Sequence, residues 1–474
     1  MDTIFGRISE KKQLDKILNS DHAEFLVVYG RRRVGKTHLI HEYVGDKFGF
    51  YVSGVLNSGI EVQQAAFRTA LEAFGLKESK ATTWLQLFQE LRQLLSERLS
   101  APKPCVVFLD ELSCFDTANS NFMSALDNFW NAWAVWQKNL KLIVCGSATS
   151  WIIDKLINNH GGLHNRLTSE MYLRPFTLAE TEQYLQSKGV RWDRSMVIEA
   201  YMVFGGIPYY LNLVEKGDSF AQMIDKAYFA QKAPLKHEYR RLFTSLYRSP
   251  EPYIKIVETL AQCKQGLTRK QIAEKIHNTS GGRLSKLLEN LINCDFVRRY
   301  YVRTKTKVSA QECIYSLSDL FTLFHLHFSP KNITEDNFWQ THINTSLIRS
   351  WQGLAFEQVV MHHIPQIKQA LGISGMGVEY YAWRSKETNP LSQIDLILDR
   401  ADNLMNICEI KYSRVDYQLN KSELDKLRER NKNFLIETGT HKGTLLTLIT
   451  SVGLKQNDYI YAIDKHITAN ELFT

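Results

Sequence analysis

The string GRRRVGKT, which occupies residues 30–37, constrains this chain more than any other part of its sequence. It fits the pattern GxxxxGK[ST], and it lies between a short apolar run, Phe25–Tyr29, and an apolar-periodic stretch, Thr37–Tyr43. We therefore expect a buried parallel strand, a glycine-rich loop and a helix that starts on the loop. The glycines let backbone N–H groups turn inward around phosphate oxygens at the positive end of the helix dipole. The pattern predicts binding of a nucleoside triphosphate.

Two side chains of the loop carry specific roles. Lys36 is expected to reach the β- and γ-phosphates, and the hydroxyl group of Thr37 is expected to bind Mg²⁺. The residues expected to surround the phosphates are Gly30, Arg31, Arg32, Arg33, Val34, Gly35, Lys36 and Thr37.

The composition is that of a soluble globular protein with several domains. A chain of 474 residues corresponds to about three or four domains, and 44% hydrophobic and 23% charged residues are ordinary values. Neither an apolar run long enough to span a membrane nor an apolar signal region is visible, so membrane insertion and export are not expected. Seven scattered cysteines without a CxxC pair favour a reducing compartment and argue against a structural zinc site. We therefore expect a cytoplasmic protein.

A second apolar run ends in two acidic residues. Cys105–Asp110 reads as a buried strand, and Glu111 follows it directly. Asp110 is expected to hold the Mg²⁺ shell, and Glu111 is expected to polarise the attacking water as a general base. The alternative is an ordinary strand terminus.

Other polar residues downstream are candidates for the same site. Ser147 and Thr149 follow a third strand-like run and could sense the γ-phosphate or the attacking water; capping the helix expected at Trp151–Ile157 is the alternative. Arg166 follows a glycine-rich segment and is a candidate arginine finger, acting in cis or from a neighbouring subunit of a homo-oligomer. An ordinary surface arginine is the other interpretation.

After Pro175 the pattern becomes helical up to about residue 245. Thr177 and Glu180 form a capping-box signature at the start of this segment. Further along, the string GGIP at 205–208 predicts that two helices meet tightly.

The net charge of +8 is concentrated in one part of the chain. Between Lys264 and Val308, eleven basic residues face three acidic ones, a surplus of 8. Such a segment is either a solvated basic face or a nucleic-acid contact, and we expect double-stranded DNA as a partner. The residues expected to neutralise DNA phosphates are Arg283, Lys286, Arg298, Arg299, Arg303, Lys305 and Lys307.

The same segment has a recognisable order of elements. Apolar spacing predicts helices at Pro252–Cys263, Thr268–Ile276 and Arg283–Asn293, followed by strands at Phe296–Val302 and Glu312–Leu317. Three helices and a hairpin are typical of a winged helix-turn-helix. A protein-binding use of that fold is the alternative to DNA binding.

From Trp351 the composition changes again. A helix opens there and carries Glu357, and strand-like runs follow at Val378–Trp383, Gln393–Asp399 and Leu404–Tyr412.

Acidic and basic residues are combined on these predicted strands. Because side chains alternate along a strand, Glu409 and Lys411 share a face, and a hairpin can bring Asp395 beside them. Two converging carboxylates can hold Mg²⁺ or Mn²⁺, and the neighbouring lysine can stabilise charge on a phosphate. This is the D…ExK pattern of restriction-endonuclease-like nucleases, in which Glu357 matches an extra acidic, metal-binding position. The alternative is a fold retained for binding without cleavage.

The motifs occur together in one order: FGRISE at 5–10, GRRRVGKT, LDE at 109–111, GGIP, and the strings QID and CEIK near the end. The set resembles the archaeal-type ATPase family of prokaryotes, related to the AAA+ and STAND branches of P-loop NTPases. The resemblance implies ATP rather than GTP, a place beside the adenine and ribose for Gly6 and Arg7, and a C-terminal PD-(D/E)XK nuclease-like domain. The usual proline before the metal-binding Asp395 is replaced by Ile394.

The sequence therefore predicts an α/β protein with a P-loop NTPase parallel sheet in residues 1–173 and a helical lid in 174–247. A winged helix-turn-helix at 248–332 and a C-terminal α/β restriction-endonuclease-like domain at 333–474 are expected to follow. The predicted function is ATP hydrolysis coupled to DNA binding and to a metal-dependent nuclease, in defence against or maintenance of mobile DNA. The alternative is an ATP-driven regulatory switch whose nuclease fold is inactive.

Overall fold

The computed structural model describes residues 4–101, 103–158, 165–263, 266–277, 281–303, 308–331, 333–385 and 392–474, with backbone alone in 301–303 and 308–312. The chain divides into two compact units. The first comprises Met1–Pro175 and Leu242–Pro250, and the second comprises Phe176–Arg241 and Glu251–Thr474. None of the helices in these described ranges is long and apolar enough to cross a membrane.

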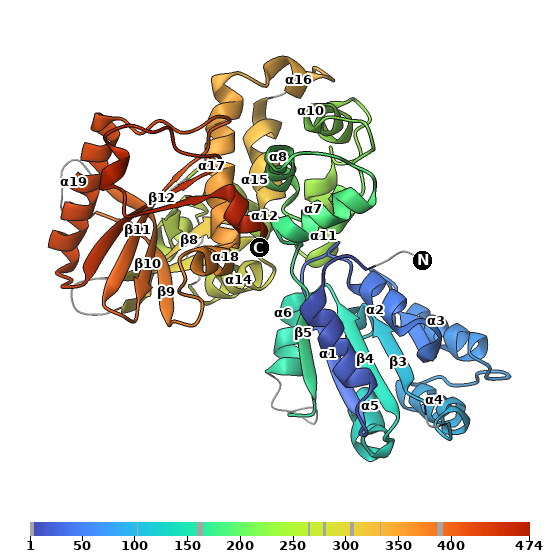
Figure 1. The fold of residues 1–474 in the computed structure, drawn as a ribbon. Helices are drawn as coiled ribbons and strands as arrows, with labels where there is room; N and C mark the ends of the chain where they lie inside the picture. Colours follow the sequence, from blue (N-terminus) through green and yellow to red (C-terminus); the bar gives the residue numbers. More distant parts are fainter. Residues whose placement is uncertain are drawn as a thin grey trace. The chain divides into compact units, whose positions relative to one another are not determined.

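The first unit is built on a parallel five-stranded sheet (Figure 1). In spatial order its strands are β2 (Phe48–Ser53), β3 (Cys105–Asp110), β4 (Leu140–Gly146), β1 (Glu24–Tyr29) and β5 (Ser169–Tyr172). β1, β3 and β4 are buried along nearly their whole length, which explains why their sequences read as continuous apolar runs. The α/β class and the parallel P-loop-type sheet that the sequence predicted are confirmed.

Helices α3 (Ile60–Ala73), α4 (Trp84–Arg98) and α5 (Phe122–Ala132) pack their apolar side chains into one core cluster with the strands. Trp84 and Trp130 are among the largest fully buried side chains in that cluster. The other helical elements of this unit are α1 (Ile8–Leu18), α2 (Lys36–Val44), α6 (Thr149–Ile152), the 3₁₀ turns η1 (Gly45–Lys47), η2 (Leu112–Cys114) and η3 (Ala134–Trp136), and the π-helical turn η4 (Ile153–Ile157).

The second unit begins with the segment that the sequence predicted as a lid. α7 (Leu178–Ser187) starts at Thr177, and Thr177 and Glu180 cap one another's backbone N–H groups, so the predicted capping box is confirmed. α8 (Arg194–Phe204) ends at Gly205 and Gly206, both of which have positive φ. A Cβ atom at Gly206 would lie 2.1 Å from the carbonyl oxygen of Phe176, so the close approach of these two segments requires glycine.

Further helices surround α7 and α8 in the second unit. They are α9 (Pro208–Leu211), α10 (Phe220–Ile224), the π-helical turn η5 (Asp225–Phe229), the first part of α11 (Glu238–Leu246), α15 (Leu320–Phe328), η6 (Ser329–Lys331), α16 (Phe338–His342), α17 (Ser346–His362) and α18 (Ile364–Ala370). α15 and α17 both pack against α8.

The basic segment folds into three helices and a small antiparallel sheet. The helices are α12 (Glu251–Ala261), α13 (Arg269–Lys275) and α14 (Gly281–Asn293). The strands β6 (Leu267–Thr268), β7 (Val297–Arg303) and β8 (Val308–Leu317) lie in the order β6-β8-β7. The element order agrees with the sequence-based expectation except for β6, a strand of two residues that was not expected.

A second five-stranded sheet completes this unit. Its order is β13-β12-β11-β10-β9, with β9 (Val378–Arg384), β10 (Gln393–Arg400) and β11 (Leu404–Lys411) antiparallel, and β11, β12 (Gly443–Thr450) and β13 (Lys465–Thr468) parallel. α19 (Lys421–Thr438) connects β11 to β12, and η7 (Ile460–Ala462) and η8 (Ala469–Phe473) flank β13.

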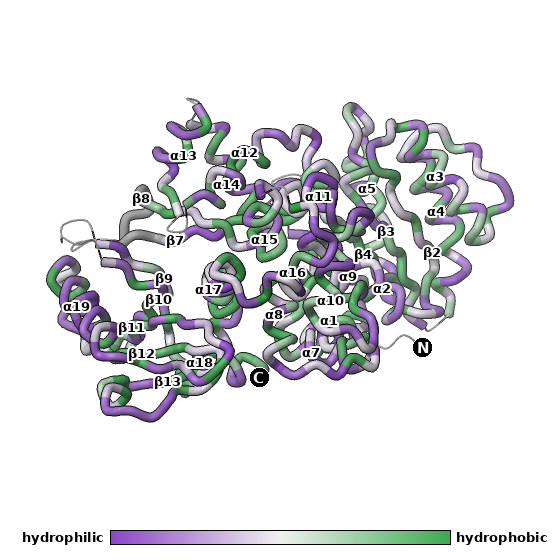
Figure 2. Tube along the Cα trace, turned by 90° about the horizontal axis from the view of Figure 1, so that it is seen from above, coloured by the Kyte–Doolittle hydropathy of each residue, from purple (hydrophilic) through white to green (hydrophobic). Residues whose placement is uncertain are grey.

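α19 is largely hydrophilic, as Figure 2 shows, but it buries Phe434 against the sheet. The strand residues around Phe434 are Tyr381, Trp383, Ile394, Ile397, Met405 and Ile407. The pairing of β10 with β9 is irregular between Ile394 and Ile397, so both isoleucines point into this cluster although they are three positions apart.

Candidate functional site

The loop Gly30–Thr37 connects β1 to α2 in a conformation that its glycines permit. Gly30, Arg33 and Gly35 have φ values of 138°, 73° and 89°. A Cβ atom at Gly30 would lie 2.4 Å from the carbonyl oxygen of Leu173, and Gly35 forms the N-terminal boundary of α2. A glycine-rich turn that leads directly into a helix N-terminus is an anion-binding arrangement.

Two side chains at the start of α2, those of Lys36 and Thr37, form hydrogen bonds at the phosphate-binding loop. Lys36 is buried, and its ammonium group donates to the carbonyl oxygens of Gly30 at 3.0 Å and Arg31 at 2.9 Å. The hydroxyl group of Thr37 donates to Oδ2 of Asp110 at 2.7 Å. Hydroxyl and carboxylate oxygens placed side by side are the ligands that Mg²⁺ prefers, so the residues present fit a bound Mg²⁺.

Asp110 and Glu111 lie where β3 ends. Asp110 is buried, and its Oδ1 accepts the backbone N–H of Glu111 at 2.9 Å. Glu111 has a left-handed backbone, with φ 46°. Its carboxylate accepts hydrogen bonds from the hydroxyl group of Ser147, 3.1 Å from Oε2, and from the Ser147 backbone N–H at 3.4 Å. Ser147 therefore fixes the direction of the carboxylate that the sequence assigned to water activation.

Other predicted site residues take different positions. Thr149 starts α6 and is fully buried, and the described part of the chain offers its hydroxyl group no hydrogen-bond partner. Arg166 is exposed on the turn before β5, and its role as an arginine finger stays a prediction.

Arg7 lies against the phosphate-binding loop. Its guanidinium group is buried and donates to the carbonyl oxygen of Val34 at 3.1 Å and to that of Arg174 at 2.6 Å. Gly6 and Arg7 both have positive φ, which turns the chain into α1. The structure thus gives Arg7 a supporting role for the loop, while contact with adenine and ribose stays a prediction.

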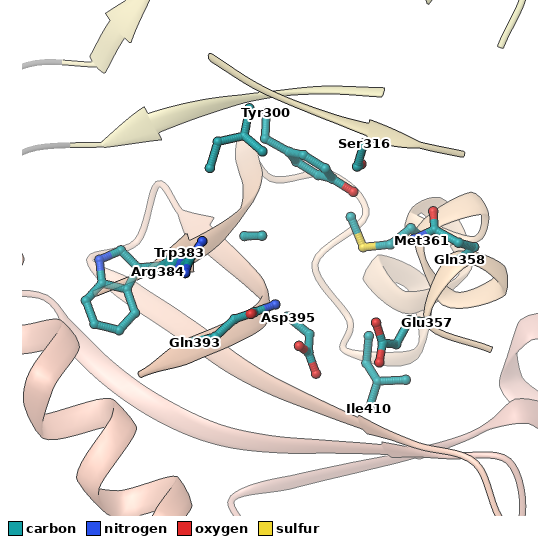
Figure 3. A pocket seen from close by; sticks show the side chains of 12 residues that line it. Tyr300, Ser316, Glu357, Gln358, Met361, Trp383, Arg384, Gln393, Asp395 and Ile410 are labelled. Atoms are coloured by element: carbon teal, nitrogen blue, oxygen red, sulfur yellow. The ribbon is translucent and has the colours of Figure 1, made fainter. Parts of the chain in front are cut away.

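A cavity in the second unit contains two of the predicted acidic residues. Glu357 comes from α17 and Asp395 from β10, and Figure 3 shows their carboxylates facing one another. The opposite wall is formed by Tyr300 and Ser316 from β7 and β8. Asp395 lies inside the irregular stretch between Ile394 and Ile397, and such an irregularity redirects side chains relative to simple alternation.

Glu409 and Lys411 lie on β11 on either side of Ile410, which lines the cavity, and both act electrostatically on Asp395. Nζ of Lys411 is 2.8 Å from Oε1 of Glu409, and Nη1 of Arg430, on α19, is 2.7 Å from Oε2. Both oxygens of Glu409 are therefore paired with cations. The sequence did not predict the role of Arg430, because no local pattern shows that a residue in the middle of α19 will pair with Glu409 on the preceding strand, β11.

The electrostatic environment of Asp395 is unfavourable for its charged form. Burial raises the pKa of Asp395 to about 6, the carboxylate of Glu409 adds to the shift, and Lys411 and Arg430 oppose it. Within the described ranges, no three His, Cys, Asp or Glu side chains are grouped so that they could hold a metal ion. The carboxylates fit a hard divalent cation in their chemistry, but in this conformation Glu357, Asp395 and Glu409 are not gathered around one point.

The predicted DNA contacts divide into three groups. Arg283 and Lys286 are exposed on α14. Arg298 donates to Tyr300 and to Gln358, and Arg299 is paired with Glu289, so these two arginines are engaged within the protein. The side chains of Arg303, Lys305 and Lys307 lie outside the described residues.

The fold and geometry of the first unit define a P-loop ATPase domain, and comparison with known proteins agrees. Residues 4–214 match the family described as an ATPase domain predominantly from Archaea. An uncharacterized protein of Methanocaldococcus jannaschii is 25% identical over 370 residues, which are 77% of each chain. A Walker-type ATPase of Pyrococcus abyssi superposes with a TM-score of 0.51 at 21% identity, covering 69% of this chain and 96% of that one, and shows the shared fold. The match to this ATPase family supports ATP binding and hydrolysis.

Proposed function

We propose that this protein is an ATPase whose nucleotide state controls a metal-dependent nuclease-like site that acts on double-stranded DNA. The observation that carries the proposal is the cavity in which the carboxylates of Glu357 and Asp395 face one another. Glu409 and Lys411 lie on the neighbouring strand β11 and act electrostatically on Asp395. ATP hydrolysis by the first unit is the supported part, and its coupling to DNA is the proposed part.

The first unit's own residues account for ATP hydrolysis as follows. Lys36 exchanges its bonds to the loop carbonyls for the β- and γ-phosphates. Thr37 and Asp110 are the residues that would hold Mg²⁺, which would supply positive charge to offset that of the phosphates. Glu111 accepts a proton from the attacking water while Ser147 keeps its carboxylate in place.

The order of elements in the C-terminal part supports a nuclease-like fold. Helix α17, which carries an acidic residue, and the short helix α18 are followed by three antiparallel strands, β9, β10 and β11. A crossing helix, α19, and a further, parallel strand, β12, come next. Glu357, Asp395 and Glu409 are the residues that would hold Mg²⁺ or Mn²⁺ there, where the ion would act as a Lewis acid on the scissile phosphate. Lys411 would place its charge next to that phosphate.

The basic segment is the proposed DNA contact. Three helices with an antiparallel hairpin, α12 to β8, support a winged helix. Arg283 and Lys286 are exposed on its third helix, the element that enters the major groove in this fold. Arg298 and Arg299 are omitted from the proposed contact because they are paired within the protein.

A second function is favoured by one observation. Lys411 and Arg430 engage both oxygens of Glu409, an arrangement that can persist as a structural ion-pair cluster without any metal. In that case the protein is an ATP-driven regulatory switch that binds DNA or another protein and does not cleave.

One experiment separates the two functions. ATPase rates are measured with and without double-stranded plasmid, in Mg²⁺ and in Mn²⁺, and the plasmid is then examined on a gel. Nicking by the wild type but not by the Lys411→Ala variant supports the nuclease. DNA-stimulated ATPase activity with intact plasmid under all conditions supports the switch.

A further inference from the structure

A buried carboxylate on a lid helix takes no part in the ATP chemistry described above. Glu199 lies in the middle of α8 and is 8% exposed. Its Oε1 accepts hydrogen bonds from Nε2 of Gln352 at 2.9 Å, from the hydroxyl group of Tyr412 at 3.1 Å and from Nη2 of Arg414 at 2.9 Å. A buried carboxylate that accepts three donors, one of them a cation, holds its partners in a defined geometry.

The partners of Glu199 flank the nuclease-like site on two elements. Gln352 lies on α17, five positions before Glu357. Tyr412 and Arg414 directly follow β11, on which Glu409 and Lys411 lie. One carboxylate on the lid therefore connects the helix that carries Glu357 to the segment that follows the strand of Glu409.

A second buried bond attaches the other end of α17 to the lid. Nε2 of His363 accepts the backbone N–H of Leu178, the first residue of α7, at 3.0 Å. Because that nitrogen is an acceptor, Nδ1 carries the proton and donates to the carbonyl oxygen of Val359 at 2.7 Å. α17 is thus tied to the lid on both sides of Glu357.

The lid helices in turn meet the chain where it leaves the ATPase unit. α7 starts three residues after Pro175, the last residue of that part of the first unit. The backbone N–H of Phe176 donates to the carbonyl oxygen of Gly206, at the end of α8, at 2.8 Å. The glycine pair therefore holds the end of α8 against Phe176, the first residue beyond Pro175.

We propose that Glu199 is a positioning residue of the nuclease-like site, through which the lid sets the placement of Glu357 relative to Asp395 and Glu409. This inference rests on the proposed function. A displacement of α7 and α8 changes the position of α17 and of the segment after β11 together, since both are bound to Glu199. The separation of the acidic residues then depends on the nucleotide state of the first unit.

The test compares Glu199→Gln with Glu215→Gln in the full-length protein. Glutamine keeps the size of Glu199 but loses the charge that pairs with Arg414. Glu215 is an exposed lid residue that pairs with the surface residue Lys226. Hydrogen–deuterium exchange of residues 346–363 and 404–414 is recorded with and without a non-hydrolysable ATP analogue and Mg²⁺. Plasmid nicking and ATPase rates are measured in parallel.

We expect the ATP analogue to change exchange in both segments of the wild type and of Glu215→Gln, and to leave them unchanged in Glu199→Gln. Nicking should fall at least tenfold in kcat for Glu199→Gln, with ATPase activity within twofold of the wild type. Tyr412→Phe removes one of the three bonds without leaving a buried charge unpaired, and it should give an intermediate loss of about threefold. It also serves as the test variant if Glu199→Gln does not fold.

The inference is overturned if neither segment of the wild type responds to the ATP analogue, or if Glu199→Gln and Tyr412→Phe respond as the wild type does. An equal loss of nicking in Glu215→Gln also overturns it, because the effect would then be general to the lid. Failure of the proposed function looks different: no variant, the wild type included, nicks DNA, while the exchange data still decide whether Glu199 transmits the nucleotide state.

Discussion

The hydroxyl group of Thr37 donates a hydrogen bond to Asp110 across 73 positions of sequence, with 2.7 Å between the two oxygens. Thr37 belongs to the phosphate-binding loop after β1, and Asp110 ends β3, so this bond joins the two motifs that define the ATP site. The sheet explains the meeting, because parallel strands bring their carboxyl ends to one edge. Thr37 and Asp110 are the two residues that would hold Mg²⁺ at this site.

The first prediction is that one substitution abolishes ATP binding, whereas another lowers turnover and leaves binding intact. Lys36→Ala should abolish ATP binding, because the charge that pairs the β- and γ-phosphates is removed. Glu111→Gln should retain binding and lose about 10²- to 10⁴-fold in turnover, since only the water-activating carboxylate is removed. Binding is measured by calorimetry and turnover by phosphate release. Turnover at the wild-type rate in Glu111→Gln would show that this residue is not the general base.

Ser147→Ala should lower turnover without affecting binding. The serine hydroxyl and backbone N–H hold the carboxylate of Glu111, so removal of the hydroxyl group leaves the general base less well oriented. We expect a smaller effect than for Glu111→Gln, about tenfold, because one of the two donors remains. Ser96→Ala, at an exposed helical serine of the same unit, is the control. A change in ATP affinity instead of kcat would mean that Ser147 contacts the nucleotide directly.

Charge reversal on α14 should weaken DNA binding in a salt-dependent way. Arg283→Glu combined with Lys286→Glu should reduce the log–log slope of affinity against salt by about 0.9 for each DNA phosphate that the protein no longer neutralises. Charge reversal at Arg298, which is hydrogen-bonded to Gln358 within the protein, should change the stability of the fold more than the salt slope of DNA affinity. Fluorescence anisotropy at several salt concentrations measures this slope. An unchanged slope in the α14 double variant would place the DNA contact elsewhere.

The ATP site could be predicted from the sequence because its information is local. The glycine loop, the apolar run before Asp110 and the small polar residues after β4 are each readable within about ten residues, and the sheet then brings them together. The second unit's cavity was predicted less completely. Alternation along β11 correctly put Glu409 and Lys411 on one face, but the irregularity that redirects Asp395 leaves no sequence signal.

Long-range polar contacts were the part that could not be predicted. Three residues that form such contacts are Arg430, Glu199 and His363, each of which binds a residue that is distant in sequence. The residues next to them in the sequence form no pattern that predicts these contacts. The pairing of Arg299 with Glu289 was missed for the same reason, because a count of basic residues does not show which of them form ion pairs within the protein. Such contacts depend on how packed elements meet, which local patterns do not encode.

His363 should make stability depend on pH. Burial lowers the pKa of His363 from 6.5 to about 4, partly offset by its hydrogen bond to Val359. Between pH 4 and pH 6.5 the unfolded state binds more protons than the folded state does. The contribution of neutral, buried His363 to the free energy of unfolding is therefore complete above about pH 6.5 and is lost as the pH falls toward 4. His363→Gln should remove about 2 kcal/mol of the stability change between pH 7 and pH 5, measured by urea unfolding.

A matched control separates this effect from general acid sensitivity. His441→Gln changes an exposed histidine of the same unit and should leave the pH dependence as in the wild type. If the His363→Gln and wild-type curves are parallel between pH 7 and pH 5, the imidazole is not buried in its neutral form.

The last prediction concerns divalent binding next to Asp395. Arg430 occupies Oε2 of Glu409, so a cation must displace that guanidinium group before it can use both carboxylates. Arg430→Gln should therefore raise the affinity for Mn²⁺ about threefold to tenfold, since one competing charge is removed, whereas Arg428→Gln, at an exposed position of α19, should not. Asp395→Asn should remove binding, and Lys411→Ala should keep binding but lose cleavage, because its charge acts on the phosphate. Calorimetric titration of the full-length protein measures these affinities. If neither the wild type nor Arg430→Gln binds Mn²⁺, with or without DNA, the ion pairs of Glu409 are structural and the regulatory switch is the correct function.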